Sequence, residues 1–252
     1  MPENTTAPGA PTRSTGAPPD PALAADGGLT FISTWSTGSP ARQRATLDAI
    51  AEAWRSRPWP HAGLLSYAVH AGADGSTVLH HSQWRDEGSY QEFFAGAANG
   101  RDARNDDIDA AVPGIARLGL NKTRLYRSWT DGRERAGREP GAVVIVRADV
   151  EGPGPDRGRA WADAVIDALD DDGPQDGAPL SAHFHLSTDG TRVLLYAQWE
   201  SGQAHADALA APGDGIVPPT PPWRRVRDFP GVLRDDAVAR YRFAYGFVPS
   251  TA

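Results

Sequence analysis

Two stretches of the chain, residues 65–84 and 180–199, repeat each other 115 positions apart without a gap, and nine of their twenty positions are identical. Each copy places an Asp-Gly pair, at 74–75 and at 189–190, between two runs of alternating apolar residues. Such a pair is the strongest short-range signal for a β-hairpin. The chain therefore contains the same hairpin twice, and an internal repeat of this kind constrains the whole fold.

The segments that surround each hairpin follow one order. A β-type run and a helical segment precede the hairpin, and a short helix and a last strand follow it. In the first copy, Ser39 and Pro40 are the expected N-cap and first residue of a helix whose apolar stripe ends at Trp54. The other predicted segments are 29–36, 87–98 and 121–129 in the first copy, and 142–146, 159–169, 202–211 and 237–247 in the second. The order β-α-β-β-α-β, found twice, is the ferredoxin-like split βαβ unit.

This order divides the 252 residues into three expected parts. Residues 29–133 form the first repeat and residues 134–252 the second. Residues 1–28 contain mostly Pro, Gly, Ala, Ser and Thr, so they are predicted to be a disordered tail. The tail has neither the basic start nor the apolar core of a signal peptide.

Composition excludes several classes of protein. The absence of Cys excludes disulfides, thiolate nucleophiles and Cys-ligated metals. The net charge of −7 argues against nucleic acid as a partner, and no apolar run is long enough to span a membrane. A cytoplasmic location follows as the default. No spacing of His and carboxylates indicates a metal site, and there is neither a phosphate-binding loop nor a nucleophile elbow.

The element order and the strand end Gln83-Trp84, repeated as Gln198-Trp199, resemble the antibiotic biosynthesis monooxygenase family of the dimeric α+β barrel superfamily. A helix with spaced aromatic residues follows the first copy. The resemblance covers roughly residues 29–250. The family's common form is a single repeat that pairs with a partner chain. The tandem form seen here is similar to the ring-cleaving oxygenases of angucycline-type pathways.

The resemblance implies a fold and an activity. The fold is α+β, with two ferredoxin-like (βαββαβ) repeats that form an intramolecular dimeric-type α+β barrel. The activity is that of an oxygenase of aromatic polyketide (antibiotic) biosynthesis, which oxidises or cleaves a ring of a planar polycyclic phenol or quinone with O2.

The resemblance leaves two cofactor states open. In cofactor-independent members a phenolic or anthrone-like substrate is deprotonated and its carbanion reduces dioxygen directly. The ring-cleaving relatives use reduced flavin (FADH2 or FMNH2) as a diffusible cosubstrate, which would come from a flavin reductase. Haem is not expected, because haem-degrading relatives place a His on the helix where this chain has Phe94 and Leu209.

Alternation along the strand assigns the expected pocket residues. Residues two apart share a face, so His80, Ser82 and Trp84 point the same way. The resemblance implies that this face looks into a cavity between the sheet and the helices. The second copy has Leu195 and Ala197 where the first has His80 and Ser82. The first repeat is therefore expected to hold the active site, and the second to be structural.

The chemistry implied by the resemblance needs a base, an oxyanion donor and an apolar pocket. His80 is the predicted base, although the family often has Asn at this position. Arg124 and Tyr126 share a face of the closing strand and are predicted to stabilise an oxyanion. The predicted substrate-binding residues are Trp84, Ser82, Trp35 and His70. His70 recurs as His185, so a structural role for it stays open.

Two other functions remain open at this point. The same fold and base would serve a polyketide cyclase or isomerase, and a barrel with a decayed site would be a non-catalytic ligand-binding protein. The long connections 99–120 and 212–236 are expected to be lids, binding loops or interface arms. Association into a homodimer is left open.

Overall fold

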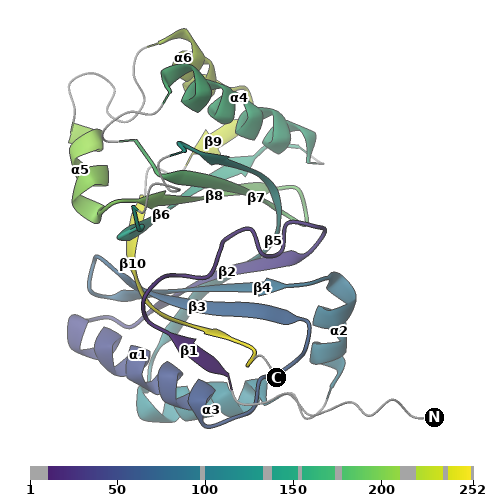
Figure 1. Cartoon of the computed structure of the whole chain (residues 1–252), viewed down its shortest axis with the longest axis vertical. Coiled ribbons are helices and arrows are strands. Elements are labelled where there is room, and N and C mark those ends of the chain that lie inside the picture. Colours follow the sequence, from purple (N-terminus) through teal and green to yellow (C-terminus); the bar gives the residue numbers. More distant parts are fainter. Residues whose placement is uncertain are drawn as a thin grey trace. The chain divides into compact units, whose positions relative to one another are not determined.

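The computed structural model describes residues 11–96, 100–132, 138–152, 155–173, 178–210, 220–234 and 238–250. The chain divides into two compact units, each a β-sheet packed against helices (Figure 1). Unit 1 consists of Met1–Leu120 and Ala244–Ala252, and unit 2 consists of Asn121–Phe243. The predicted α+β class with two ferredoxin-like repeats is confirmed.

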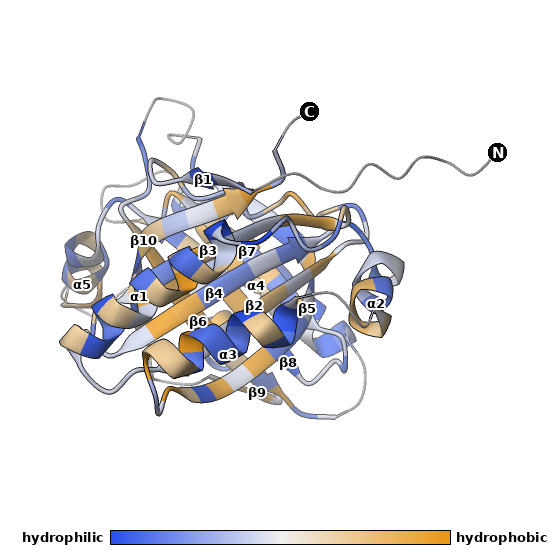
Figure 2. Ribbon diagram, turned by 90° about the horizontal axis from the view of Figure 1, so that it is seen from below, coloured by the Kyte–Doolittle hydropathy of each residue, from blue (hydrophilic) through white to orange (hydrophobic). Residues whose placement is uncertain are grey.

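Unit 1 contains the first βαββαβ repeat and two additional elements. Its sheet has the strand order β1-β10-β3-β4-β2-β5. The elements of the repeat are β2 (Leu29–Ser36), α1 (Pro40–Arg55), β3 (Leu64–Gly72), β4 (Thr77–Trp84), α2 (Glu87–Ala95) and β5 (Ala116–Thr130). The additional elements are β1 (Thr12–Ser14) and α3 (Arg101–Ala111). Figure 2 shows α1 and α3 side by side in front of the strands, with hydrophilic residues on their outer sides.

Local chemistry explains the start of the first helix and the hairpin turn. Ser39 caps α1 by accepting a hydrogen bond from the Arg42 backbone N–H, and Pro40 occupies the first helical position, as predicted. In the hairpin turn the Asp74 carboxylate accepts bonds from the N–H groups of Ser76 and Thr77. These side-chain bonds replace backbone bonds that the turn cannot make.

Unit 2 repeats this plan. Its sheet has the order β5-β7-β8-β6-β9, and β10 also pairs with β6. Its elements are β6 (Ala142–Val150), α4 (Asp156–Asp172), β7 (Ser181–Ser187), β8 (Arg192–Trp199), α5 (Gly202–Ala210), α6 (Pro221–Arg227), β9 (Val232–Arg234) and β10 (Ala239–Val248). Helix α6 packs on α4. The hairpins β3–β4 and β7–β8 confirm the predicted repeat.

The two closing strands run from one unit into the other. β5 begins in unit 1, and its residues Thr123–Thr130 pair with β7 in unit 2. β10 pairs with β6 in unit 2, and its last residues, Gly246–Val248, pair with β1 in unit 1. The boundaries of the two compact units therefore lie within these strands, and the division of the sequence into repeats between residues 133 and 134 stays a prediction. Closure of the two sheets into a barrel stays a prediction.

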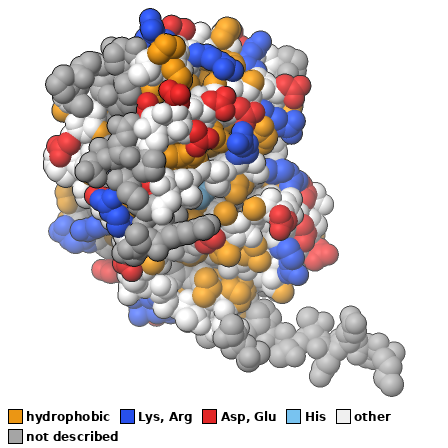
Figure 3. Space-filling view, turned by 45° about the horizontal axis from the view of Figure 1, so that its top comes forward, with side chains coloured by type: hydrophobic (Ala, Val, Ile, Leu, Met, Phe, Trp, Pro, Cys, Tyr) orange, Lys and Arg blue, Asp and Glu red, His pale blue; other side chains and the backbone are white. Residues whose placement is uncertain are grey.

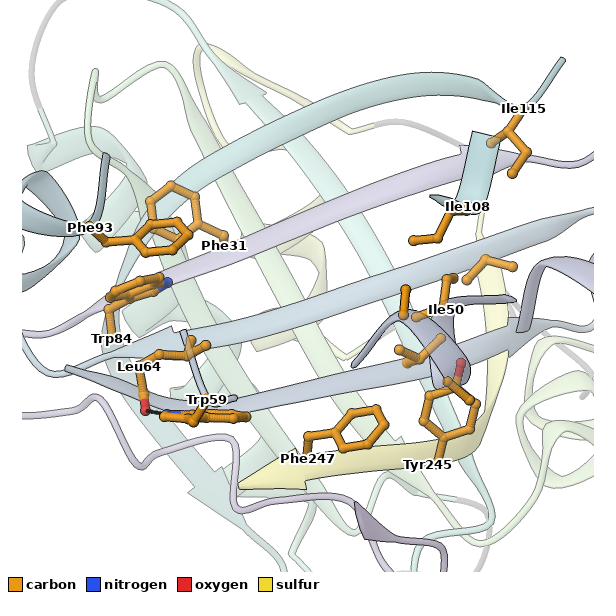
Figure 4. Packing of buried hydrophobic residues seen from close by; sticks show 14 of the residues in the cluster. Phe31, Ile50, Trp59, Leu64, Trp84, Phe93, Ile108, Ile115, Tyr245 and Phe247 are labelled. Carbon is orange, nitrogen blue, oxygen red and sulfur yellow. Dashed lines mark hydrogen bonds between the residues drawn. The ribbon is translucent and has the colours of Figure 1, made fainter. Parts of the chain in front are cut away.

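The core of unit 1 includes residues from the far end of the chain (Figure 4). Tyr245 and Phe247 of β10 are buried beside Ile50 of α1 and other apolar side chains of this unit. The Tyr245 hydroxyl donates a hydrogen bond to the Leu47 backbone carbonyl. Trp59, which is also buried, donates from its indole nitrogen to the Leu64 carbonyl at 2.9 Å. The last residues of the chain thus belong to the core of the first repeat.

The predicted disordered tail differs from the structure over residues 11–28. Thr12–Ser14 forms a short strand against β10. Gln83, on the face of β4 opposite Trp84, donates to the Asp20 carbonyl and accepts a bond from the Ala24 N–H. These residues gain backbone partners that composition alone does not reveal. Residues 1–10 of the predicted tail lie outside the described residues.

The long connections carry secondary structure that the sequence pattern did not predict. α3 lies within 99–120, and α6 and β9 lie within 212–236. No helix in the described part of the chain has the length and apolar character needed to cross a membrane. Figure 3 shows acidic and basic side chains interspersed over the visible face.

Candidate functional site

Unit 1 contains a pocket of about 210 Å³ between its sheet and its helices. The lining side chains come from strands β2, β3, β4 and β5, from α2 and α3, and from the end of α1 and the connection that follows it. Eight of the eighteen lining residues are Phe, Trp or Tyr: Phe31, Trp35, Trp54, Tyr67, Trp84, Tyr90, Phe93 and Phe94. Among the described residues that line it there is no carboxylate. An apolar wall with a few polar groups is the usual character of a small-molecule site.

His80, Ser82 and Trp84 all line this pocket. The prediction that they share one face of β4 is therefore confirmed. Trp35, on β2, lines the pocket as well. Trp84 packs against Phe93 of α2, with ring centroids 5.1 Å apart, and so seals the end of the pocket next to that helix. The functional roles of these residues stay predictions.

The imidazole of His80 is the central polar group of the pocket. Only 5% of His80 is exposed. Its Nδ1 lies 2.6 Å from the Tyr67 hydroxyl, and its ring lies 4.2 Å from the ring of Trp35, measured between centroids. Its Nε2 is buried and has no hydrogen-bond partner among the described residues. His80 is thus fixed on one side and unsatisfied on the other.

Burial keeps His80 in its neutral form. Desolvation, together with the positive charge of Arg117, lowers the pKa of His80 to about 3. Arg117, on the unit 1 part of β5, places its guanidinium 4.6 Å from the centre of the Trp35 ring. Burial also raises the pKa of the Tyr67 hydroxyl well above its usual range. Both members of the pair are therefore uncharged at neutral pH.

Helix α3 contributes a buried cation to the pocket. Arg104 is 6% exposed and donates to the Pro58 carbonyl at 2.7 Å. Its guanidinium lies 5.0 Å from the centre of the Trp54 ring, and Trp54 in turn stacks on Tyr67. Desolvation and the neighbouring Arg57 lower the pKa of Arg104 to about 10, so it stays charged at neutral pH. With Arg101 also on the wall, the pocket is electropositive.

Tyr67 and Arg104 are site residues that sequence reasoning missed. Tyr67 could have been found, because it lies on the predicted hairpin and alternation gives it the same face of β3 as Val69, which pairs with His80. Arg104 gave no such signal, since it lies in a connection where no helix was expected.

Three predicted site residues are not part of this pocket. His70 is fully buried, but alternation along β3 places it on the face opposite Tyr67. Arg124 and Tyr126 lie on the part of β5 that belongs to unit 2. There the Tyr126 hydroxyl donates to Asp163 of α4 at 3.0 Å, and Asp163 also accepts a bond from Arg127. Tyr126 is held in this contact, at an irregularity in the pairing of β5 with β7.

The equivalent positions of unit 2 are apolar, as the sequence indicated. In the two hairpins Tyr67 pairs with Ser82, where Ala182 pairs with Ala197. Leu195 stands in the position of His80 and packs with Ala142, Val144, Ala197 and Trp199. The polar pair at the centre of the unit 1 pocket is thus absent from the matching strands of unit 2.

Phe94 and Leu209, on which the expectation of no haem is based, have side chains without a donor atom for iron. Phe94 lines the unit 1 pocket and Leu209 is 41% exposed, and neither side chain can bind iron. His205 is buried on α5, and its Nδ1 accepts a hydrogen bond from Arg240 at 2.7 Å. Within the described ranges, no three His, Asp or Glu side chains gather as they would around a metal ion.

Comparison with known proteins identifies the fold. No family model matches the sequence, and no curated protein matches it either. An anthrone oxidase-like protein of known structure superposes with a TM-score of 0.61 and 18% identity, over 93% of this chain and 95% of its own.

Two further structures agree. Proteins to which monooxygenase activity is ascribed, from Lactobacillus acidophilus NCFM and Fusobacterium nucleatum, give TM-scores of 0.50 and 0.51 at 10% and 8% identity. Each match covers 89% of this chain, and 97% and 95% of the other chain respectively. Identities this low establish a shared fold and nothing more.

Proposed function

We propose that the protein is an oxygenase that acts on a planar, oxygenated polycyclic substrate of aromatic polyketide type, bound in the unit 1 pocket. The observation that carries this proposal is the buried His80–Tyr67 pair inside an aromatic wall, which unit 2 lacks. The shared fold with an anthrone oxidase-like protein supports it. The resemblance to the antibiotic biosynthesis monooxygenase family agrees with the same chemistry.

The pocket suits a flat aromatic molecule. Trp35 and Trp84 lie on adjoining strands and line the pocket together with Phe31 and Tyr90. Aromatic side chains hold planar rings by stacking and edge contacts and exclude water at the same time. A dry pocket also strengthens every hydrogen bond that the substrate makes to His80.

In the cofactor-independent form of the proposal, dioxygen and the substrate supply all the atoms and electrons of the reaction. Oxidation of a ring CH2 group to a carbonyl takes one O2. One oxygen atom becomes the carbonyl and the other leaves as water with the two hydrogens. His80 is the side chain placed to contact the oxygen substituent of the reacting ring system. Arg104 and Arg117 supply positive charge that favours the anionic form of that ring system.

A ring-cleaving reaction would instead draw on reduced flavin supplied in solution by a partner reductase. The two forms of the proposal share the pocket and differ in the source of electrons. Oxygen consumption measured with and without reduced flavin therefore separates them.

The decisive experiment measures oxygen uptake by the purified chain with a hydroxylated anthrone and, separately, with a hydroxylated polycyclic quinone. Uptake above the uncatalysed rate supports the proposal if His80→Ala abolishes it. The matched control is Leu195→Ala in unit 2, which should keep the uptake of the unchanged chain. No uptake with either substrate, with or without flavin, would refute an oxygenase. Substrate turnover without oxygen would then identify a cyclase or isomerase, and binding without turnover a ligand-binding protein.

A further inference from the structure

The short contact between Tyr67 and His80 fixes where the imidazole carries its proton. A neutral imidazole has one N–H and one acceptor nitrogen, and the bond made by one nitrogen decides the state of the other. The Tyr67 hydroxyl lies 2.6 Å from Nδ1. Either the hydroxyl donates to Nδ1 or an Nδ1–H donates to the hydroxyl oxygen.

The geometry favours the hydroxyl as donor. Bonds donated by N–H to oxygen usually measure about 2.9–3.0 Å between heavy atoms, whereas bonds donated by O–H are shorter. The observed 2.6 Å belongs to the second kind. A buried tyrosine hydroxyl also needs an acceptor for its proton, and Nδ1 is the acceptor that it meets. With the hydroxyl as donor to Nδ1, the single proton of the neutral imidazole is on Nε2.

In this tautomer the Nε2–H group is a hydrogen-bond donor without an acceptor in the described part of the chain. It is buried and has no partner among the described residues, in a pocket whose described lining contains no carboxylate to receive it. An unsatisfied buried donor destabilises the empty pocket, so a molecule that supplies an acceptor oxygen at this place relieves that penalty.

We propose that His80 acts as a neutral hydrogen-bond donor to a carbonyl or ionised hydroxyl oxygen of the bound molecule, and that Tyr67 is the positioning residue that keeps its proton on Nε2. His80 would then donate a hydrogen bond to the bound molecule, whereas the base role predicted from the sequence requires it to accept a proton. The donor role rests on the proposed function in one respect only, which is that the acceptor is an oxygen of an aromatic substrate. The low pKa of His80 agrees with it, since an imidazole that resists protonation is a poor base at neutral pH.

The assignment also names a class of ligand. The pocket should take polycyclic molecules that present a carbonyl or phenolate oxygen, and reject hydrocarbons of the same shape. Discrimination by a single hydrogen bond is large when the site's own polar group is left unpaired. A base at this position would not select for an acceptor oxygen in this way.

The first test reads the tautomer directly in the protein without substrate. Nitrogen-15 NMR of the full chain with labelled histidine distinguishes Nε2–H, Nδ1–H and doubly protonated rings, and the signal lost in His80→Gln identifies His80. We expect the neutral Nε2–H form from pH 5 to 8. Tyr67→Phe should shift His80 towards a mixture of tautomers, and Tyr90→Phe, which removes another pocket hydroxyl, should not. A dominant Nδ1–H form, or protonation near pH 6.5, would overturn the assignment.

The second test uses substitutions that keep or remove the donor. In His80→Gln the amide N–H group replaces Nε2–H as a hydrogen-bond donor, but the side chain cannot act as a base. In His80→Ala both the donor and the base are lost. The probes are hydroxyanthraquinone and anthracene, with binding followed by fluorescence. We expect His80→Ala to weaken hydroxyanthraquinone binding at least tenfold and to leave anthracene binding within about twofold, and His80→Gln to stay within about fivefold of the unchanged chain. Equal loss in both variants would contradict a donor role.

The two proposals fail separately. The NMR experiment requires neither turnover nor oxygen, so an inactive protein with the Nε2–H tautomer would refute the oxygenase and keep the donor. Active oxygenation by a protein with the Nδ1–H tautomer would refute the donor role and keep the oxygenase.

Discussion

At the scale of single residues, His80 is the central polar group of the pocket, because it is buried, neutral and fixed by Tyr67. Its position on β4 could be read from alternation alone, since the face of a residue on a strand is a local property. Its partnership with Tyr67 follows from the hairpin register, which the Asp-Gly turn sets. The contact of Tyr126 with Asp163 could not be predicted, because it arises after β5 has crossed into unit 2.

Replacing His80 by Leu, the residue at the equivalent position of unit 2, should remove part of the acid sensitivity of the fold. The pKa of His80 is lowered to about 3, against about 6.5 in an unfolded chain. Between pH 6.5 and about 3, His80 is therefore protonated in the unfolded state and neutral in the folded state. The free energy of unfolding falls as the pH drops through this range. Tyr67, Arg117 and His70 interact with His80.

We expect His80→Leu to flatten the dependence of unfolding free energy on pH by up to about 1 kcal/mol per pH unit below 6.5. Urea unfolding at pH 7.5 and pH 5 measures the difference. Ser82→Ala on the same strand is the control and should keep the original slope. His70, whose pKa is lowered to about 3 by burial and by the neighbouring His80, remains in every variant, but the part of its shift that comes from His80 is lost in His80→Leu. Equal slopes in His80→Leu and the control would show that His80 titrates alike in both states.

At the scale of elements, the strands and the helices that flank the hairpins follow from periodicity and caps, whereas α3 does not. Only Arg104 and Ile108 of its residues are buried, so it lacks the apolar stripe by which a helix is recognised. Its position against α1 is a tertiary contact that closes the pocket. A largely polar helix that buries only two side chains, one of them a cation, gives no apolar pattern from which it could be predicted.

The cation that α3 contributes should matter for stability. Arg104→Leu removes the hydrogen bond to the Pro58 carbonyl and the contact with Trp54. We expect the free energy of unfolding to fall by about 1–3 kcal/mol, and binding of an anionic aromatic ligand to weaken. Arg44→Leu, which changes an exposed arginine on α1, should change neither quantity. Chemical unfolding and ligand titration give both results, and unchanged stability in Arg104→Leu would exclude a supporting role.

The second hairpin turn depends on one carboxylate. Asp189 accepts hydrogen bonds from the Ser187 hydroxyl and from the N–H and hydroxyl of Thr191, and the bond from Ser187 is the main reason that its pKa falls to about 2. Because the folded pKa lies below the unfolded value, its contribution is present above about pH 4 and is lost as the pH falls through 2.

Asp189→Ala should therefore lower the free energy of unfolding at pH 7 by about 1 kcal/mol, a modest value because the turn is exposed to water. The difference from the unchanged chain should shrink as the pH approaches 2. Thermal unfolding at several pH values tests this, with Asp26→Ala as an exposed control. If the difference in unfolding free energy between the two chains grew as the pH fell, the Asp189 carboxylate would not be its cause.

At the scale of the whole molecule, the sequence repeat and the folded units have different boundaries. The repeat divides the chain into consecutive halves, whereas the core of unit 1 is completed by residues from the opposite end of the chain. The sequence showed two copies of one motif, but no local pattern tells which sheet receives a closing strand. That choice is made by long-range pairing.

Removal of residues 244–252 should therefore unfold unit 1, although the truncated segment is far from it in sequence. Phe247 is fully buried there, and loss of one such side chain alone typically costs about 3–5 kcal/mol. A chain that ends at Val248 is the matched control and should keep its fold. Near-ultraviolet circular dichroism and binding of the aromatic probe measure the outcome, and a peptide of residues 239–250 should restore both. Full binding by the chain that ends at residue 243 would show that the unit 1 part of β10 is dispensable.

Having both repeats in one chain also separates their evolutionary fates. Where two identical chains pair, every substitution changes both pockets at once, so neither can lose its polar residues without the other. Here a mutation at Leu195 leaves His80 untouched. One copy is then free to accumulate changes that favour packing, while the other keeps its buried His80–Tyr67 pair.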